Sequence, residues 1–140
     1  MIIRAKELVT SVEIVSDIDV RISKGKIADI SESTSQSADY STEILVPGFV
    51  DIHCHGGNGF HFFDLNAKAA EESARFQLKH GTTSIVASFI AAQIPDLQRE
   101  ISFLVDRLPL LNIVGIHLEG PYLSETFCGA HNPSFLSAPT

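Results

Sequence analysis

Two histidines separated by a single residue are the strongest candidates for chemistry in this sequence. His53 and His55 stand at the end of an apolar run, and a glycine-rich stretch, residues 56–59, follows them. Alternate residues of a strand project from one face, so the two imidazoles should converge while Cys54 points away. Neutral imidazole is the commonest protein ligand for metal ions. Surface or packing histidines are the alternative, and the pairing at a strand end favours metal ligation.

A glutamate much later in the chain is the best partner for these histidines. Glu119 directly follows another apolar run, and Gly120-Pro121 then reorients the chain. A carboxylate at that position can face the same site as His53 and His55, although an ordinary loop glutamate is the alternative. His117 precedes Glu119 by two residues and should share its face, as a further ligand, a hydrogen-bond partner of a ligand or a core residue.

Hydrolysis is the reaction that such a metal site supports. A bound divalent ion lowers the pKa of its water and polarises a carbonyl group, which makes hydroxide available near neutral pH. Three protein ligands and one water suit zinc, while iron, manganese and cobalt accept the same donors. A complete catalyst also needs a general acid or base. No second inward-facing carboxylate is evident, because Asp51 should lie deeper in the strand.

A turn-rich segment after Glu119 offers groups that could orient a polar ligand. Residues 129–133 (GAHNP) bring backbone N–H groups, the imidazole of His131 and the amide of Asn132. A plain surface turn accounts for the same residues equally well, so the chemistry of this segment alone leaves both interpretations open.

The first third of the chain predicts a small β-region rather than a barrel. Polar residues separate short β-like runs, and a hairpin turn is expected at 23–26. The runs cover residues 12–15, 18–22 and 26–30. Residues 31–41 are polar and rich in serine, which indicates a loop or linker. We therefore expect an amino-terminal β-region over residues 1–46.

From residue 47 onward, strands and helices are predicted to alternate. Buried strands are expected over residues 46–53, 82–89 and 112–118. Asn66 should cap the first helix and Gly81 should follow its end, whereas Pro95 should open the second, which should stop near Pro109. The apolar faces comprise Ala67, Ala70, Ala74 and Leu78 in the first helix, and Leu97, Ile101, Leu104, Val105 and Leu108 in the second. This alternation implies an α/β class with parallel strands.

Composition excludes several classes of protein. Hydrophobic residues make up 44% of the chain and charged residues 19%, which is typical of a globular domain. The net charge of −7 argues against nucleic acid as a partner, since phosphate binding needs a basic patch. No stretch approaches the roughly 18 apolar residues of a membrane span. The two cysteines should be reduced thiols, and we expect a cytoplasmic protein with no membrane contact.

Three segments together resemble the N-acetylglucosamine-6-phosphate deacetylases, which are members of the amidohydrolase superfamily. They are PGFVDIHCHGG at 47–57, HGTT at 80–83, and GIHLEGPY at 115–122 followed by GAHNP at 129–133. The first segment is shared by many amidohydrolases, whereas the last pair is far more specific for the deacetylases. The resemblance implies a (β/α)8 barrel with a small β-sandwich domain. Residues 1–46 would belong to the sandwich, and residues 47–140 would form the first three β/α units of the barrel.

The resemblance also implies roles for particular residues. Glu119 matches the family's metal-binding glutamate, and His53 and His55 match the His-x-His pair of the members that have it, so a second metal position fits. Ala130 and His131 match the loop that contacts the amino-sugar substrate. In this family a metal-activated water attacks the acetamide carbonyl, and an aspartate late in the barrel handles the proton.

The length of the chain limits what the resemblance can imply. A complete barrel takes roughly 250 residues, so the middle-strand histidines and the late aspartate are expected outside these 140 residues. We expect no catalytic residue in this chain and no deacetylase activity from it alone. The parent enzyme should be a homo-oligomer acting on N-acetylglucosamine 6-phosphate, a small amino-sugar phosphate. The alternatives are another amidohydrolase of the dihydroorotase or deaminase type, and a non-catalytic remnant.

Overall fold

The computed structural model describes residues 1–34, 36–107 and 111–139. The chain divides into two compact units, Met1–Pro47 and Gly48–Thr140, each with its own sheet and hydrophobic core. The second unit carries the candidate metal ligands.

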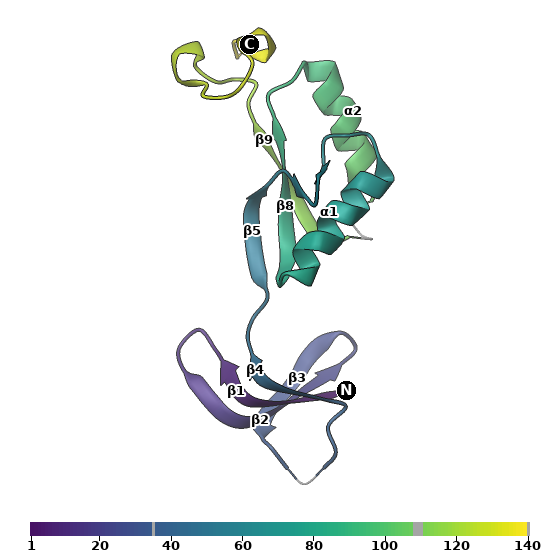
Figure 1. Ribbon diagram of the computed structural model, residues 1–140, viewed down its shortest axis with the longest axis vertical. Helices are drawn as coiled ribbons and strands as arrows, with labels where there is room; N and C mark the ends of the chain where they lie inside the picture. Colours follow the sequence, from purple (N-terminus) through teal and green to yellow (C-terminus); the bar gives the residue numbers. More distant parts are fainter. Residues whose placement is uncertain (35, 108–110, 140) are drawn as a thin grey trace. The chain divides into compact units, whose positions relative to one another are not determined.

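The first unit is a four-stranded mixed sheet in the order β3-β2-β1-β4 (Figure 1). Its strands are β1 (Ile2–Val9), β2 (Ile14–Ser23), β3 (Lys26–Glu32) and β4 (Tyr40–Leu45). Strand β2 pairs antiparallel with β1 and with β3, whereas β4 pairs parallel with β1. A small core formed by Leu8, Ile18 and Val20 holds this sheet together.

The turn between β2 and β3 confirms the predicted hairpin. Lys24 and Gly25 both have positive φ, at 51° and 72°, as a two-residue turn of type I′ requires. The predicted polar linker over residues 31–41 is wrong at both ends, because β3 extends to Glu32 and β4 begins at Tyr40. Ser31 and Glu32 pair with β2 through their backbones while their side chains stay exposed, so polar composition does not prevent a strand there.

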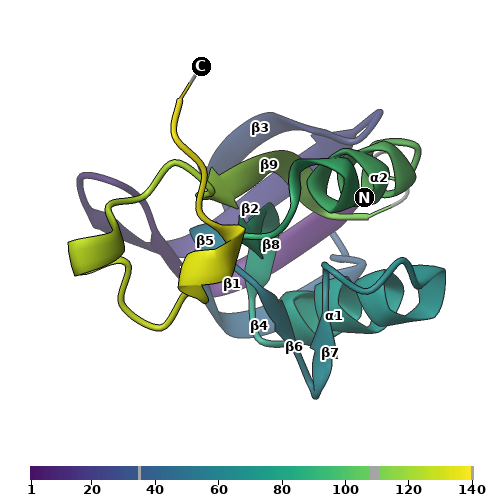
Figure 2. The same ribbon diagram turned by 90° about the horizontal axis from the view of Figure 1, so that it is seen from above.

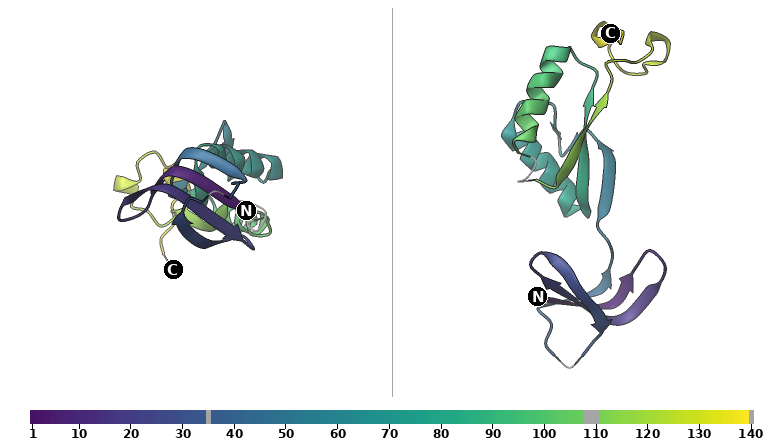
Figure 3. Two further views of the ribbon diagram at one scale, coloured as in Figure 1. Left: turned by 90° about the horizontal axis from the view of Figure 1, so that it is seen from below. Right: turned by 180° about the vertical axis from the view of Figure 1, so that it is seen from behind.

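The second unit is built on a three-stranded parallel sheet in the order β5-β8-β9. Its main elements are β5 (Phe49–Cys54), α1 (Ala67–Lys79), β8 (Thr82–Ile90), α2 (Ile94–Val105) and β9 (Ile113–Glu119). Two short strands, β6 (Gly56–Gly57) and β7 (Phe60–His61), precede α1, and the 3-10 helices η2 (Glu125–Phe127) and η3 (Pro133–Phe135) follow β9. Both α-helices lie on the same face of the sheet in all views (Figures 1, 2 and 3). The predicted α/β class with parallel strands is therefore confirmed.

Local sequence signals set the helix ends as predicted. The Asn66 side chain accepts hydrogen bonds from the backbone N–H groups of Lys68 and Ala69, and Gly81 follows the last turn with φ of +93°. Helix α2 begins one residue before Pro95. The expected end near Pro109 and the contribution of Leu108 lie outside the described residues. Within the described part of the chain, no helix is both long and apolar enough to cross a membrane.

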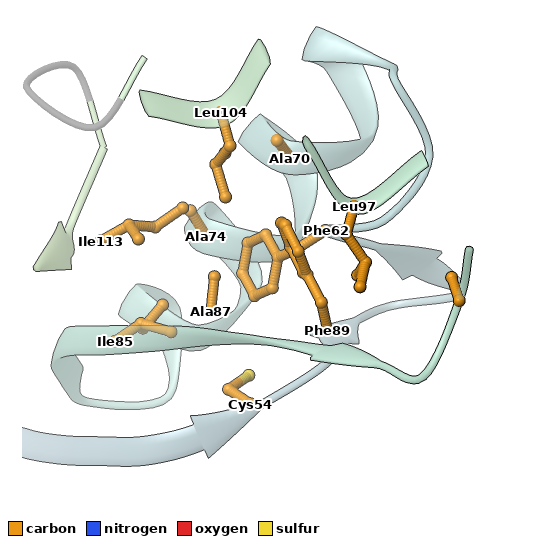
Figure 4. Close-up of a cluster of buried hydrophobic side chains, with 11 residues drawn as sticks. Cys54, Phe62, Ala70, Ala74, Ile85, Ala87, Phe89, Leu97, Leu104 and Ile113 are labelled. Carbon is orange, nitrogen blue, oxygen red and sulfur yellow. The ribbon is translucent and has the colours of Figure 1, made fainter. Parts of the chain in front are cut away.

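The core of the second unit lies between the helices and β8 (Figure 4). Phe62 and Phe89 occupy its centre, next to Leu97. Ala70 and Ala74 are almost fully buried, and their small side chains let α1 approach the sheet closely. The members of the core are Cys54, Phe62, Ala70, Ala74, Ile85, Ala87, Phe89, Ala92, Leu97, Leu104 and Ile113.

Strand β5 is far more exposed than its apolar sequence predicts. Phe49, Val50 and Ile52 are 64%, 64% and 73% exposed, so the strand that was expected to be buried is exposed within the described sheet. The reason is its position, because β5 is at the edge of the sheet and α1 packs on β8 and on the short β6–β7 hairpin. An apolar sequence indicates that a strand can be buried. Whether it is buried depends on the elements that pack against it.

Leu104→Ala should lower the free energy of unfolding by about 2–5 kcal/mol, because Leu104 is fully buried between α2 and the sheet. Val105→Ala is the matched control on the same helix, and it should have little effect because Val105 is 47% exposed. Urea unfolding of both variants checks this. Equal effects would contradict the assignment of this helix face to the core.

Candidate metal centre

The parallel sheet brings the three predicted metal ligands to one edge. His53 lies in β5, His55 directly follows that strand, and Glu119 is the last residue of β9. Parallel strands end at the same edge of a sheet, which is where barrel enzymes place their active sites. The donor atoms of these three side chains all lie within 4.8 Å of one another. The three side chains are therefore clustered at one edge of the sheet, as predicted.

The spacing of the donor atoms suits a single small ion. The two histidine Nε2 atoms are 3.1 Å apart, and each is 3.2 Å from Glu119 Oε2. Two atoms that ligate one zinc ion at about 2.1 Å are separated by about 3.0–3.4 Å, depending on the bond angle. The triangle of donors thus has the right size, and two imidazoles with one carboxylate are donors that zinc and similar ions accept.

Ser88 of the central strand β8 contacts two histidines, His55 and His117. The backbone oxygen of Ser88 is 2.9 Å from His55 Nδ1, and the Ser88 hydroxyl is 3.1 Å from His117 Nδ1. The ring of His117 also packs edge-on against the ring of His53, with 4.9 Å between centroids. His117 is not one of the three clustered donors among the described residues. Among the described residues, His117 makes no hydrogen bond to the three clustered side chains, and it contacts His53 by ring packing.

The second oxygen of Glu119 is engaged by the loop that follows β9. His131 Nε2 lies 3.4 Å from Glu119 Oε1, and His131 Nδ1 accepts a hydrogen bond of 3.2 Å from the N–H of Ala91. A backbone N–H can only donate, so Nδ1 is unprotonated and the proton of neutral His131 is on Nε2, facing the carboxylate. Burial raises the pKa of Glu119, but hydrogen bonds from His131 and His53 outweigh it, and the net pKa lies below the usual value.

A cavity of about 660 Å³ opens beside the clustered ligands. His55 and Glu119 line it together with Ala130 and His131, the two residues of the predicted substrate loop. The other lining residues are Ile90, Ala91, Leu123, Phe127, Cys128, Gly129, Asn132 and Phe135. No lysine or arginine of the described residues lines the cavity. Its chemistry therefore suits an uncharged polar group next to an apolar wall.

Two helical side chains that sequence analysis did not single out hold the segment after His55 in place. Gln77 donates to the backbone oxygen of Gly56 at 2.9 Å, and the buried carboxylate of Glu100 accepts from the N–H of Leu65 at 3.0 Å. Both come from helices, where their polar type suggests an exposed position. Ser88 was also missed. Ser84, Val86 and Ser88 are alternate residues of β8, and this pattern could have indicated that their side chains share one face of the strand.

Comparison with known proteins gives a consistent result. No family model matches the chain. The N-acetylgalactosamine-6-phosphate deacetylase of Escherichia coli O157:H7 is 27% identical over 136 residues, which cover 94% of this chain. The N-acetylglucosamine-6-phosphate deacetylase of Bacillus subtilis strain 168 is 30% identical over 144 residues and covers 93% of this chain. The crystal structure of the N-acetyl-D-glucosamine-6-phosphate deacetylase of Mycobacterium smegmatis superposes on the whole chain with a TM-score of 0.90 and 33% identity.

The chain is homologous to the N-acetylglucosamine-6-phosphate deacetylases. It spans 36% of the length of each of the two curated relatives and 41% of the Mycobacterium smegmatis chain. A mutant of the Mycobacterium smegmatis deacetylase has been solved in complex with N-acetyl-D-glucosamine-6-phosphate. These deacetylases are metal-dependent amidohydrolases built on a TIM barrel. The cluster of His53, His55 and Glu119 thus occurs in a chain whose relatives use a metal.

The buried Glu100 should make stability depend on pH. Burial raises its pKa, an effect partly offset by the Leu65 N–H and Arg99 and reinforced by Asp64 and Asp96. Because the folded pKa lies above the usual 4.5, the folded state favours the protonated form. Its contribution to stability is therefore present below pH 4.5 and is lost as pH rises through the folded pKa.

Glu100→Gln removes this titration and keeps an acceptor for Leu65. The free energy of unfolding of the wild type, relative to that of Glu100→Gln, should therefore fall as pH rises above 4.5. Chemical unfolding of both proteins between pH 4 and 8 measures the difference. A difference that stays constant or grows with pH would contradict the burial of this carboxyl.

Proposed function

We propose that the protein is a metal-dependent N-acetylglucosamine-6-phosphate deacetylase, in which this chain forms one wall of the active site. The observation that carries the proposal is the triangle of His53, His55 and Glu119 donors at the carboxyl ends of two parallel strands. The homology to deacetylases over nearly the whole chain supports it. Removal of the acetyl group would release acetate and glucosamine 6-phosphate.

His53, His55 and Glu119 would hold the ion, and we propose zinc, with iron, manganese or cobalt as alternatives. When bound, such an ion supplies Lewis-acid activation of a carbonyl and of water near neutral pH. The pKa of Glu119 lies below its usual value, so its carboxylate is ionised and can ligate beside the two imidazoles. His-x-His together with Glu119 also leaves room for a second metal position that further residues would complete.

Ala130 and His131 are proposed as the substrate-binding residues of this wall. Both line the cavity beside Glu119, and the Nε2 proton of His131 is fixed by the Ala91 contact. The contact between His131 Nε2 and Glu119 Oε1 holds the ring in place, and the ring can shape the wall against which an acetamide group would lie. Ala130 presents only a methyl group, which leaves the backbone approachable. The lack of lysine and arginine among the described lining residues suits the uncharged acetamide end of the sugar rather than its phosphate.

Proton transfer needs a group beyond those in the cluster. Among the described residues, Glu119 is the only carboxylate within the group of clustered donors, and it is proposed as a ligand. Asp51 accepts a hydrogen bond from the backbone N–H of His53, so its carboxylate is engaged within β5. We therefore propose that the general acid and base come from outside the described residues, and that these residues alone do not turn over substrate.

The remaining expectations follow from the same proposal. We propose that residues 1–46 belong to a small β-sandwich domain and that residues 47–140 supply the first three β/α units of a (β/α)8 barrel. The intact enzyme is proposed to act in the cytoplasm, because a sugar phosphate is charged and stays on the side of the membrane where it is made. It is also proposed to be a homo-oligomer. Neither nucleic acid nor a membrane is proposed as a partner.

N-acetylgalactosamine 6-phosphate is a second candidate substrate. The observation in its favour is that the Escherichia coli O157:H7 relative, which covers 94% of this chain, is named for that sugar. The two sugars differ only in the orientation of one ring hydroxyl, which is not on the carbon that carries the acetamide. The same site chemistry would therefore serve both, and only rates can separate them.

Metal binding should depend on the three clustered donors. The intact protein that carries this sequence should bind zinc, and replacing His53, His55 or Glu119 by alanine should weaken binding by more than about 100-fold, the upper range for losing a residue that only supports a ligand. His80→Ala is the control, because His80 bonds to the Phe76 carbonyl at the end of α1. Calorimetric titration of metal-free protein measures the affinities. Unchanged zinc affinity in all three variants would refute the site.

Acetate release tests the activity itself. The intact protein should release acetate from N-acetylglucosamine 6-phosphate, lose this activity with a chelator and regain it with zinc, because the ion activates the attacking water. Glu119→Gln should lower kcat/KM by more than about 100-fold. N-acetylgalactosamine 6-phosphate is assayed in parallel. Turnover of dihydroorotate or of an amino-substituted base, without acetate release from either sugar, would instead favour the dihydroorotase-like or deaminase-like alternative.

A further inference from the structure

Ser88 connects the histidines of both outer strands. It lies in β8, between β5 and β9, and it is the register partner of His117. Only 1% of its surface is exposed. Its backbone oxygen bonds to His55 Nδ1 at 2.9 Å, and its hydroxyl bonds to His117 Nδ1 at 3.1 Å. One buried residue thus fixes a ring on each side of it.

The first of these contacts determines which nitrogen of His55 can ligate a metal. A carbonyl oxygen can only accept, so His55 Nδ1 must carry the proton. In the neutral ring the lone pair is then on Nε2, the atom that faces His53 Nε2 and Glu119 Oε2. The contact with Ser88 therefore selects the tautomer that the metal site needs.

The second contact acts on His53 through His117. Within the described residues, no hydrogen bond to His53 Nδ1 is found, so the orientation of this ring depends on its neighbours. The ring of His117 stands edge-on to it, with 4.9 Å between centroids and an angle of 69°. The Ser88 hydroxyl can donate to or accept from His117 Nδ1, and it holds the ring of His117 in either tautomer.

We propose that Ser88 is the positioning residue of the metal centre, acting on His55 through its carbonyl and on His53 through its hydroxyl and His117. The inference rests on the proposed metal site and deepens it. Ser88 touches no metal or substrate in this scheme. Its effect is to aim two Nε2 atoms at one point before any ion arrives, which lowers the cost of ordering the ligands on binding.

The test is a cobalt titration of the metal-free intact protein, followed by visible absorption and by calorimetry. Ser88→Ala removes the hydroxyl and keeps the backbone contact, so it should weaken cobalt binding by about tenfold. Ser88→Thr keeps a hydroxyl and suits a strand, so binding should return to within about threefold of wild type. Ser73→Ala is the matched control, because Ser73 is fully buried and its hydroxyl has no hydrogen-bond partner among the described residues. It should leave the affinity unchanged.

A double-mutant cycle identifies the route. If the hydroxyl acts through His117, then Ser88→Ala should add less than about twofold in a His117→Ala background. An affinity of Ser88→Ala equal to that of wild type would overturn the proposal. A loss of the same size with and without His117 would overturn the route through that ring.

A measurement on the wild type keeps the proposal testable if Ser88→Ala does not fold. In a nitrogen-15 histidine NMR spectrum of metal-free protein, the His55 signal, assigned by its loss in His55→Gln, should show a protonated Nδ1. If His55 instead carries its proton on Nε2 and has an unprotonated Nδ1, it cannot donate to the Ser88 carbonyl, and the proposal is overturned. Failure of the proposed metal site would give a different result. Replacing His53, His55 or Glu119 would then leave the cobalt affinity of the protein unchanged.

Discussion

The parallel pairing of β8 with both of its neighbours is the constraint on which the site depends. His53 and Glu119 are 66 positions apart in the sequence, and only the shared edge of one sheet brings them to 3.2 Å. Because β5 and β9 run in the same direction as β8, their carboxyl ends emerge together. A one-residue shift of either strand would turn its ligand to the helix-covered face, where burial against α1 and α2 leaves no room for an ion. The buried core around Phe89 therefore also sets the register of the ligands.

The two oxygens of Glu119 have different neighbours, and these contacts together set the orientation of the carboxylate. Oε2 faces the two Nε2 atoms, while Oε1 faces His131, whose own tautomer is set by the N–H of Ala91. The loop after β9 is thereby tied to the sheet through Glu119, the proposed metal ligand. In the proposed enzyme, a substrate group bound beside His131 would lie next to the proposed metal ligands, because His131, His53 and His55 all contact the same carboxylate.

The sequence predicted what depends on local rules and missed what depends on neighbours. The Asn66 cap, the glycine after α1 and the turn between β2 and β3 follow from residue type and backbone conformation, and all were found. The convergence of His53, His55 and Glu119 followed from strand spacing combined with a parallel class. The exposure of β5 and the strands at the ends of the serine-rich stretch could not be predicted, because they depend on which elements pack or pair alongside. Ser88 and Glu100 escaped for the same reason, since only tertiary contacts give a buried serine or glutamate its partners.

Anomalous scattering from a crystal of the intact protein grown with zinc tests the central claim most directly. Difference density at the zinc edge should show a peak about 2.1 Å from His53 Nε2, from His55 Nε2 and from Glu119 Oε2. The same map should show His55 Nδ1 still bonded to the backbone oxygen of Ser88. A zinc peak bound only by other residues, with these three side chains free of it, would contradict the account.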